Sequence, residues 1–138
     1  MQIETLRAAR ELVPLIKQHR GDTEAARRIA HPVVDSLRES GLCRLAIPRE
    51  LNGLELPIND ALEVYETLAG AEATVGWIVW NNTLPSFWGR FLEPTARAEI
   101  FGNANDLYAS STRPSGKAVV NGVGYRVTGR WSLLSGCE

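Results

Sequence analysis

The spacing of apolar residues changes near residue 104, and no other feature of the sequence restricts the fold as strongly. Upstream, apolar residues recur at the spacing of helices that pack on a core. Downstream, the segment KAVVNGVGYRVTGRWSLL (residues 117–134) alternates, is rich in β-branched residues and carries NGVG at its centre, which is typical of a β-hairpin. We predict a mainly α chain, with a helical domain over residues 1–103 and the first strands of an incomplete β-domain over residues 104–138.

The predicted β part is too small to be stable by itself. Two or three strands do not form an independent sheet, and a lone hairpin leaves strand edges unpaired and an apolar face uncovered. We expect further chain or another subunit to complete it, so the 138 residues are interpreted as the leading portion of a larger protein.

Proline, glycine and capping residues divide the helical part. We expect five helices, over residues 3–19, 23–40, 60–69, 73–89 and 94–102, with a structured loop at 42–57. Gly21 and Asp22 are predicted to stop the first helix and cap the second. Pro32 is predicted to kink or break the second helix near His31, and Gly41 to end it. The inward-facing residues are predicted to be Ile3, Leu6, Leu12, Val13 and Ile16 in the first helix and Ala26, Ile29, Val33 and Leu37 in the second.

Three further segments carry local expectations. Asp60 followed by Glu63 resembles a capping box at the start of the third helix. Residues 107–111, LYASS, are a candidate short strand. Residues 73–89 carry no charge, but their asparagines and proline make them a poor membrane span, so a helix buried all round is expected.

Charge and cysteine content exclude several function classes. The net charge is −1, from 15 basic and 16 acidic residues, with no basic cluster for nucleic acid. Cys43 and Cys137 fit no metal spacing, and two reduced thiols are favoured over a disulfide. We expect a cytoplasmic protein with no metal, no nucleic-acid partner and no membrane span.

Three motifs, in this order, resemble the acyl-CoA dehydrogenase superfamily of flavoproteins. They are GLCRLAIPRELNGLELP (residues 41–57), YETLAGAEATVGWIVW (residues 65–80) and GKAVVNGVGYRVTGRWSLLSG (residues 116–136). The GRW…SG form of the third motif is most similar to the flavin-dependent monooxygenase branch. The resemblance implies an N-terminal helical domain, a middle β-domain, a C-terminal helical bundle, and FAD or FMN as the cofactor.

The resemblance also implies flavin-binding residues. Ser110 and Ser111 match the stretch that passes along the pyrimidine edge of the flavin. The stretch from Trp131 matches the strand on the flavin face, where Leu134 stands at a position that carries a hydroxyl in the family and Ser135 is its neighbour. Trp131 is interpreted as either a cover for the ring or a packing residue.

Trp77, Trp80, Phe87 and Trp88 form an aromatic stretch. Residues three apart share a helix side, so Trp77, Trp80 and the nearby Leu84 are candidates for a substrate wall, and a plain buried helix is the alternative. Asn81 and Asn82 are predicted partners for the indole N–H groups. The monooxygenase branch often has a histidine where this chain has Leu84, so we assign no catalytic residue and expect the catalytic groups beyond residue 138.

These observations predict a flavin-dependent oxidoreductase in the intact protein. A monooxygenase that uses reduced flavin and dioxygen on an aromatic or polycyclic substrate, with a separate flavin reductase and a homotetrameric assembly, is favoured. An acyl-CoA dehydrogenase acting on an acyl-CoA thioester is the alternative within the superfamily. A non-catalytic helical module that adds its hairpin to a partner's sheet is the alternative from another class. The 138 residues alone are expected to bind flavin weakly or not at all.

Overall fold

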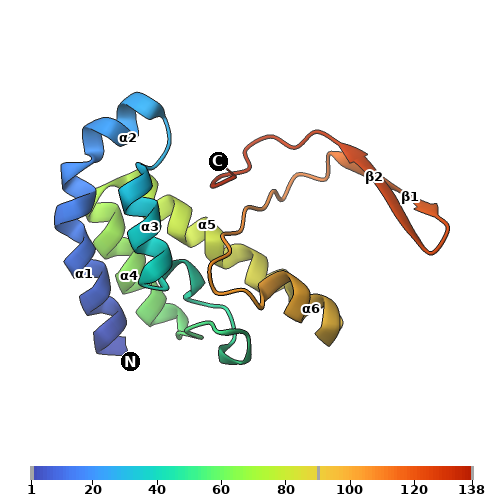
Figure 1. The fold of residues 1–138 in the computed structure, drawn as a ribbon, viewed down its shortest axis with the longest axis horizontal. Helices are drawn as coiled ribbons and strands as arrows, with labels where there is room; N and C mark the ends of the chain where they lie inside the picture. The colour runs from blue at the N-terminus through green and yellow to red at the C-terminus, as the bar shows by residue number, and fades with distance from the viewer. Residues whose placement is uncertain (1, 90, 138) are drawn as a thin grey trace.

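The computed structural model describes residues 2–89 and 91–137, without the side chains of Gln2, Ile3, Ser86 and Phe87. The predictions made for Ile3 and Phe87 therefore lie outside the described residues. The elements are α1 Gln2–Gln18, α2 Arg20–Ala26, α3 His31–Glu39, η1 Leu42–Arg44, η2 Arg49–Leu51, α4 Ile58–Ala71, α5 Ala73–Gly89, α6 Pro94–Phe101, β1 Gly116–Asn121 and β2 Gly124–Gly129. Helices followed by an antiparallel hairpin confirm the predicted fold class. The hairpin projects away from the helices, and the chain then runs back toward them (Figure 1).

The core lies where α1, α3, α4 and α5 meet. The fully buried side chains come from all four helices and from the loop between α3 and α4, and include Ile16, Val33, Leu37, Leu42, Leu45, Val64, Leu68, Val75 and Val79. α4 and α5 cross closely because Gly76 has no side chain. A Cβ at Gly76 would lie 2.6 Å from the Cβ of Ala69. The loop between η1 and α4 is ordered, as predicted, and closes a smaller cluster of Ile47, Leu51 and Phe101.

The predicted second helix is two helices. α2 ends at Ala26, and Arg27 then takes a left-handed backbone conformation with φ 54°. α3 starts at His31 with Pro32 in its first turn, which confirms the predicted break. The predicted stop at Gly21 is wrong, because Gly21 lies inside α2. Its small entropic penalty does not outweigh the helical hydrogen bonds around it.

The cap predicted at Asp22 is also wrong. His19 occupies the N-cap position of α2, and its Nδ1 lies 2.7 Å from the Asp22 carboxylate. The Thr23 N–H donates to the His19 carbonyl oxygen, so the helical pattern continues through this turn. Ala26 is exposed because α2 ends there. The other residues predicted to face inward from the second helix, Ile29, Val33 and Leu37, are buried.

Gly41 ends α3 as predicted, with φ 71° and its N–H donating to the Arg38 carbonyl oxygen. The capping box predicted at Asp60 and Glu63 is wrong. α4 begins earlier, at Ile58, with Pro57 as its N-cap, so Asp60 lies within the first turn.

α5 contains the uncharged segment, but the prediction that it is buried all round is wrong. Val75 and Val79 belong to the core, whereas the Trp77 and Trp88 side chains are 55% and 61% exposed. α5 packs against α4 and η1 and also contacts α6, and its aromatic side is only partly covered by the described part of the chain.

The hairpin has the predicted turn. Asn121 pairs with Gly124, and Gly122, the first residue of the two-residue turn, has φ 63°, which glycine adopts without strain. Residues 107–111 do not form the predicted strand. The Tyr108 N–H donates to the Asn82 side chain instead of to a neighbouring strand.

Candidate functional site

The exposed side of α5 carries the residues predicted for substrate contact. Trp77, Trp80 and Leu84 are three and seven residues apart, so they follow one face of the helix. The Trp77 and Trp80 ring centroids lie 5.1 Å apart with a 45° angle between the ring planes. Trp80 is 37% exposed and Leu84 is half-buried, so this face is an accessible aromatic surface.

Two segments predicted to face a flavin run beside each other. The Ser111 hydroxyl donates to the Ser132 carbonyl oxygen at 3.3 Å and accepts a hydrogen bond from the Arg113 N–H. The Ser115 hydroxyl donates to the Arg130 carbonyl oxygen at 2.9 Å. Side-chain hydroxyls thus hold the chain before β1 against the chain after β2.

A third hydrogen bond joins these segments to α5. The indole N–H of Trp77 donates to the Ser135 hydroxyl at 3.1 Å. The prediction that Asn81 or Asn82 accepts the indole N–H is wrong for Trp77, because its N–H donates to Ser135. The Asn82 side-chain oxygen accepts from the Tyr108 N–H instead, and the amide N–H groups of both asparagines donate to helix carbonyl oxygens one turn earlier. A residue predicted for substrate and one predicted for flavin are therefore in direct contact.

Trp131 and Leu134 occupy different settings. The Trp131 ring lies against Gly116 and Gly129, which pair across the hairpin, and 42% of the side chain stays exposed. Leu134 is half-buried, and its carbonyl oxygen accepts a hydrogen bond from the Cys137 N–H. Trp131 is thus fixed on one side by the hairpin and free on the other.

These segments suit a flavin in donor chemistry. Reduced flavin gathers negative charge on its ring, so hydroxyls and backbone N–H groups on small residues are the groups that would hold it. Ser110 and Ser111 are half-buried rather than packed into the core, so this stretch remains open to a ligand. Leu134 contributes only its backbone to such a contact.

Sequence patterns did not point to Arg44, whose side chain is only 3% exposed. Its guanidinium donates to the carbonyl oxygens of Leu51, Asn52, Phe101 and Asn103 and to the Tyr108 hydroxyl. Those acceptors are mostly backbone atoms in distant segments, which leave no trace in local sequence patterns. Arg44 thereby ties η2, the end of α6 and Tyr108 together.

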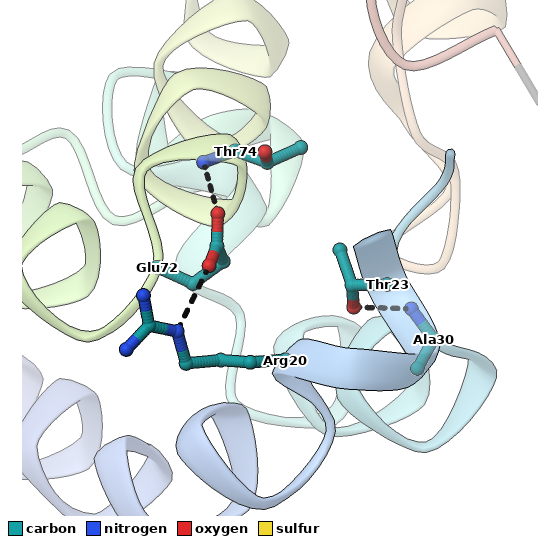
Figure 2. A network of polar contacts seen from close by, with 5 residues as sticks. All are labelled: Arg20, Thr23, Ala30, Glu72 and Thr74. Atoms are coloured by element: carbon teal, nitrogen blue, oxygen red, sulfur yellow. Dashed lines mark hydrogen bonds and ion pairs between the residues drawn. The ribbon is translucent and has the colours of Figure 1, made fainter. Parts of the chain in front are cut away.

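A cavity of about 420 Å³ lies elsewhere, between α2, the loop after it and the start of α5. Its lining is of mixed charge and consists of Arg20, Thr23, Glu24, Arg27, Arg28, Glu72 and Thr74. Figure 2 shows how its walls are held: Glu72 accepts from the Thr74 N–H and the Arg20 guanidinium, and Thr23 accepts from the Ala30 N–H. The Thr74 amide, and then Arg20, lower the pKa of Glu72. This cavity contains none of the residues predicted for flavin or substrate.

Two buried ionisable groups lie outside the segments described above. Burial raises the pKa of the Cys43 thiol to about 12 and also raises the pKa of the Tyr65 hydroxyl, so both stay protonated at neutral pH. Cys43 and Cys137 are both free, as predicted.

Within residues 2–89 and 91–137, no cluster of acidic, histidine or cysteine side chains could hold a metal ion. In the same ranges, every helix falls short of the length and apolar character needed to cross a bilayer.

The helical unit passes into an antiparallel hairpin, and the chain after β2 returns to the aromatic face of α5, in the element order that the resemblance to acyl-CoA dehydrogenase-like proteins implied. The family model described as "Acyl-CoA dehydrogenase, N-terminal domain" matches residues 4–88, and the chain belongs to this family.

Several proteins similar to this chain are named as monooxygenases. Indole-3-acetate monooxygenase from Acinetobacter baumannii is 28% identical, over 85% of this chain and 30% of its own length. The HsaA monooxygenase from Mycobacterium tuberculosis superposes with a TM-score of 0.89 at 28% identity, over 99% of this chain and 37% of its own. XiaF from a Streptomyces species, solved with FADH2 and glycerol, superposes with a TM-score of 0.87 at 25% identity, over 93% and 33% of the two chains. The chain spans about a third of the length of these relatives.

Proposed function

We propose that these residues form the N-terminal part of the oxygenase component of a flavin-dependent monooxygenase that hydroxylates an aromatic substrate. The observation that carries the proposal is the hydrogen bond from Trp77 to Ser135, which joins the aromatic face of α5 to a segment predicted to contact flavin. Proteins named as monooxygenases are similar to this chain over most of its length, and one similar structure, XiaF, was solved with FADH2.

The cofactor is FAD or FMN in its reduced form, which when bound supplies the electrons that activate dioxygen. The Ser110 hydroxyl and the backbone at Ser110, at Ser111 and from Trp131 to Ser135 would hold the flavin ring, and the exposed side of Trp131 would contact it. The Ser111 hydroxyl already holds the Ser132 carbonyl, so the two sides of this cradle are joined before ligand binds.

The substrate is a small aromatic or polycyclic molecule. Trp77 and Trp80 offer tilted ring faces, which favour stacking against another aromatic ring, and Leu84 extends the apolar surface along the same side of α5. No charged side chain of α5 lies on this face, because the helix has none. The surface therefore favours a substrate with an uncharged aromatic part.

The proposal includes partners. An oxygenase that uses reduced flavin needs a supply of it, and a separate flavin reductase fits that need; the M. tuberculosis relative is named an oxygenase subunit. A homotetramer and a cytoplasmic location remain predictions from the family resemblance and the composition.

The test is an activity assay on the complete protein with a flavin reductase, a nicotinamide reductant, dioxygen and a panel of phenols and indoles. We expect a hydroxylated product that depends on both the reductase and dioxygen. The family match leaves the dehydrogenase activity as the second candidate. Loss of flavin colour on anaerobic addition of an acyl-CoA thioester, with no hydroxylation, would favour that candidate and contradict the proposal.

A further inference from the structure

Residues 107–111 have no strand partner in the described part of the chain, yet the position of Tyr108 is fixed from three directions. Its N–H donates to the Asn82 side-chain oxygen at 2.7 Å, and its hydroxyl accepts from the Arg44 guanidinium at 3.1 Å. Its ring lies 5.0 Å from the Phe101 ring, centroid to centroid. Tyr108 precedes Ser110 by two residues, so whatever fixes Tyr108 also limits where Ser110 can lie.

Asn82 is the contact that acts on the backbone itself. It is fully buried on α5, and both ends of its amide are used: the nitrogen donates to the Ile78 carbonyl oxygen at 3.1 Å, and the oxygen accepts from Tyr108. A buried backbone N–H without an acceptor is costly, so the Tyr108 N–H holds the chain at this point of α5.

Asn82 also lies against the other predicted flavin segment. A Cβ on Gly136 would be 3.6 Å from the Asn82 amide nitrogen, and Gly136 follows Ser135 directly. One buried amide thus binds the chain near Ser110 by a hydrogen bond and lies close to the chain near Ser135.

We propose that Asn82 is a positioning residue for the cofactor: it sets the place of residues 107–111 on α5, and so the place of the Ser110 and Ser111 groups that contact flavin. The inference rests on the proposed function for the identity of the ligand. Asn82 does not touch flavin in this account; it acts through Tyr108. Because α5 belongs to the core, the hydrogen bond from Tyr108 to the Asn82 amide restricts the motion of residues 107–111, which have no regular structure.

Asn81 provides a matched control. Its side chain makes the same kind of bond as Asn82, from the amide nitrogen to the carbonyl oxygen four residues earlier, at 2.8 Å. Both side chains are buried, with 7% exposure for Asn81 and none for Asn82. The hydrogen bond to Tyr108 belongs to Asn82, so comparing the two variants isolates the effect of that bond.

The test compares Asn82→Leu and Asn81→Leu, which keep the branching of the side-chain heavy atoms and remove the amide, in the complete protein. In the absence of flavin, hydrogen exchange of the Tyr108 amide is expected to speed up by about tenfold or more in Asn82→Leu and to stay within about twofold of wild type in Asn81→Leu. Titration with reduced FAD is expected to show about tenfold weaker binding for Asn82→Leu, and the absorbance spectrum of bound oxidised FAD is expected to shift in that variant only.

The outcomes separate this inference from the proposed function. If wild type binds FAD and the two variants agree in amide exchange, affinity and flavin spectrum, the inference is wrong. If wild type takes up neither FAD nor FMN while Asn82→Leu still releases the Tyr108 amide, the proposed function fails and the positioning of residues 107–111 stands.

If Asn82→Leu does not fold, amide exchange in the wild-type protein still tests the inference. The Tyr108 amide is then expected to exchange as slowly as the amide of Val79 in the core of α5. Exchange as fast as that of the exposed Thr112 would overturn the inference.

Discussion

Nη2 of Arg44 donates a hydrogen bond of 2.7 Å to the carbonyl oxygen of Phe101, 57 residues further along the chain. Phe101 is the last residue of α6, where helix carbonyls lack partners within the helix and carry partial negative charge. The buried guanidinium therefore satisfies a helix end and fixes α6 against η2 and Tyr108.

Replacing Arg44 by methionine is expected to lower the free energy of unfolding by about 3 kcal/mol or more, because several carbonyl oxygens lose their donor at once. Chemical denaturation of the two proteins measures the difference. Arg49→Met is the control: its side chain is 59% exposed and pairs with Glu55 at the surface, so it should change stability by no more than about 0.5 kcal/mol. Equal effects of the two changes would contradict the role given to Arg44.

Two helical glycines should respond in opposite directions to alanine. At Gly76 a Cβ would lie 2.6 Å from the Ala69 Cβ and 2.8 Å from its Cα, so α4 and α5 must move apart, at about 1–3 kcal/mol. At Gly70 nothing lies within 4 Å, and alanine should stabilise α4 by up to about 1 kcal/mol. Thermal denaturation of both variants tests the difference. A Gly76→Ala protein as stable as wild type would mean that the helices are not this close.

Stability is expected to fall at alkaline pH through Cys43. Its pKa is raised from 9.0 to about 12 in the folded protein by burial, so the folded state holds the thiol proton more tightly than the unfolded state. The contribution of the protonated thiol to the free energy of unfolding is complete below pH 9. It is lost as the pH rises toward 12, on the order of 1 kcal/mol per pH unit.

Denaturation at a series of pH values should therefore show a shallower alkaline slope in Cys43→Ala than in wild type. Cys137→Ala, at an exposed thiol, should keep the wild-type slope. Tyr65, whose pKa burial also raises, contributes to the slope that remains, and Tyr65→Phe should reduce it. Identical slopes in wild type and Cys43→Ala would refute the assignment.

The contact between Trp77 and Ser135 should be separable from the aromatic stack. Trp77→Phe keeps an aromatic ring but removes the indole N–H, so residues 132–137 should exchange amide hydrogens faster. In Trp80→Phe the donor to Ser135 is intact, and the same residues should exchange as in wild type. Faster exchange in both variants, or in neither, would show that the hydrogen bond does not hold this segment.

The sequence was most informative where the signal is local. The uncharged run of α5 and the glycine turn of the β1–β2 hairpin lie within one element each, and both were predicted. The predictions of a helix stop at Gly21 and a capping box at Asp60 were wrong because a glycine or an acidic residue favours a helix end without requiring one. The backbone hydrogen bonds of α2 and α4 continue through both positions.

The sequence predicted the parts of the candidate site separately and did not predict the contacts between them. Periodicity puts Trp77 and Trp80 on one face of α5, and the structure agrees. The bond from Trp77 to Ser135 spans 58 residues and the bond from Asn82 to Tyr108 spans 26, and neither has a sequence signature. Asn81 and Asn82 are adjacent and identical in the sequence, so the sequence does not show which of them binds residues 107–111. The division of the chain at residue 104 and the roles of the serines remain predictions.

The most direct test of the account is hydrogen exchange on the complete protein, measured anaerobically with and without reduced FAD. We expect uptake of reduced FAD with protection at residues 107–111 and 132–135, and no change in α1, α2 or α3. Failure to take up FAD or FMN in either redox state, or protection confined to the helices around the α2 cavity, would contradict it.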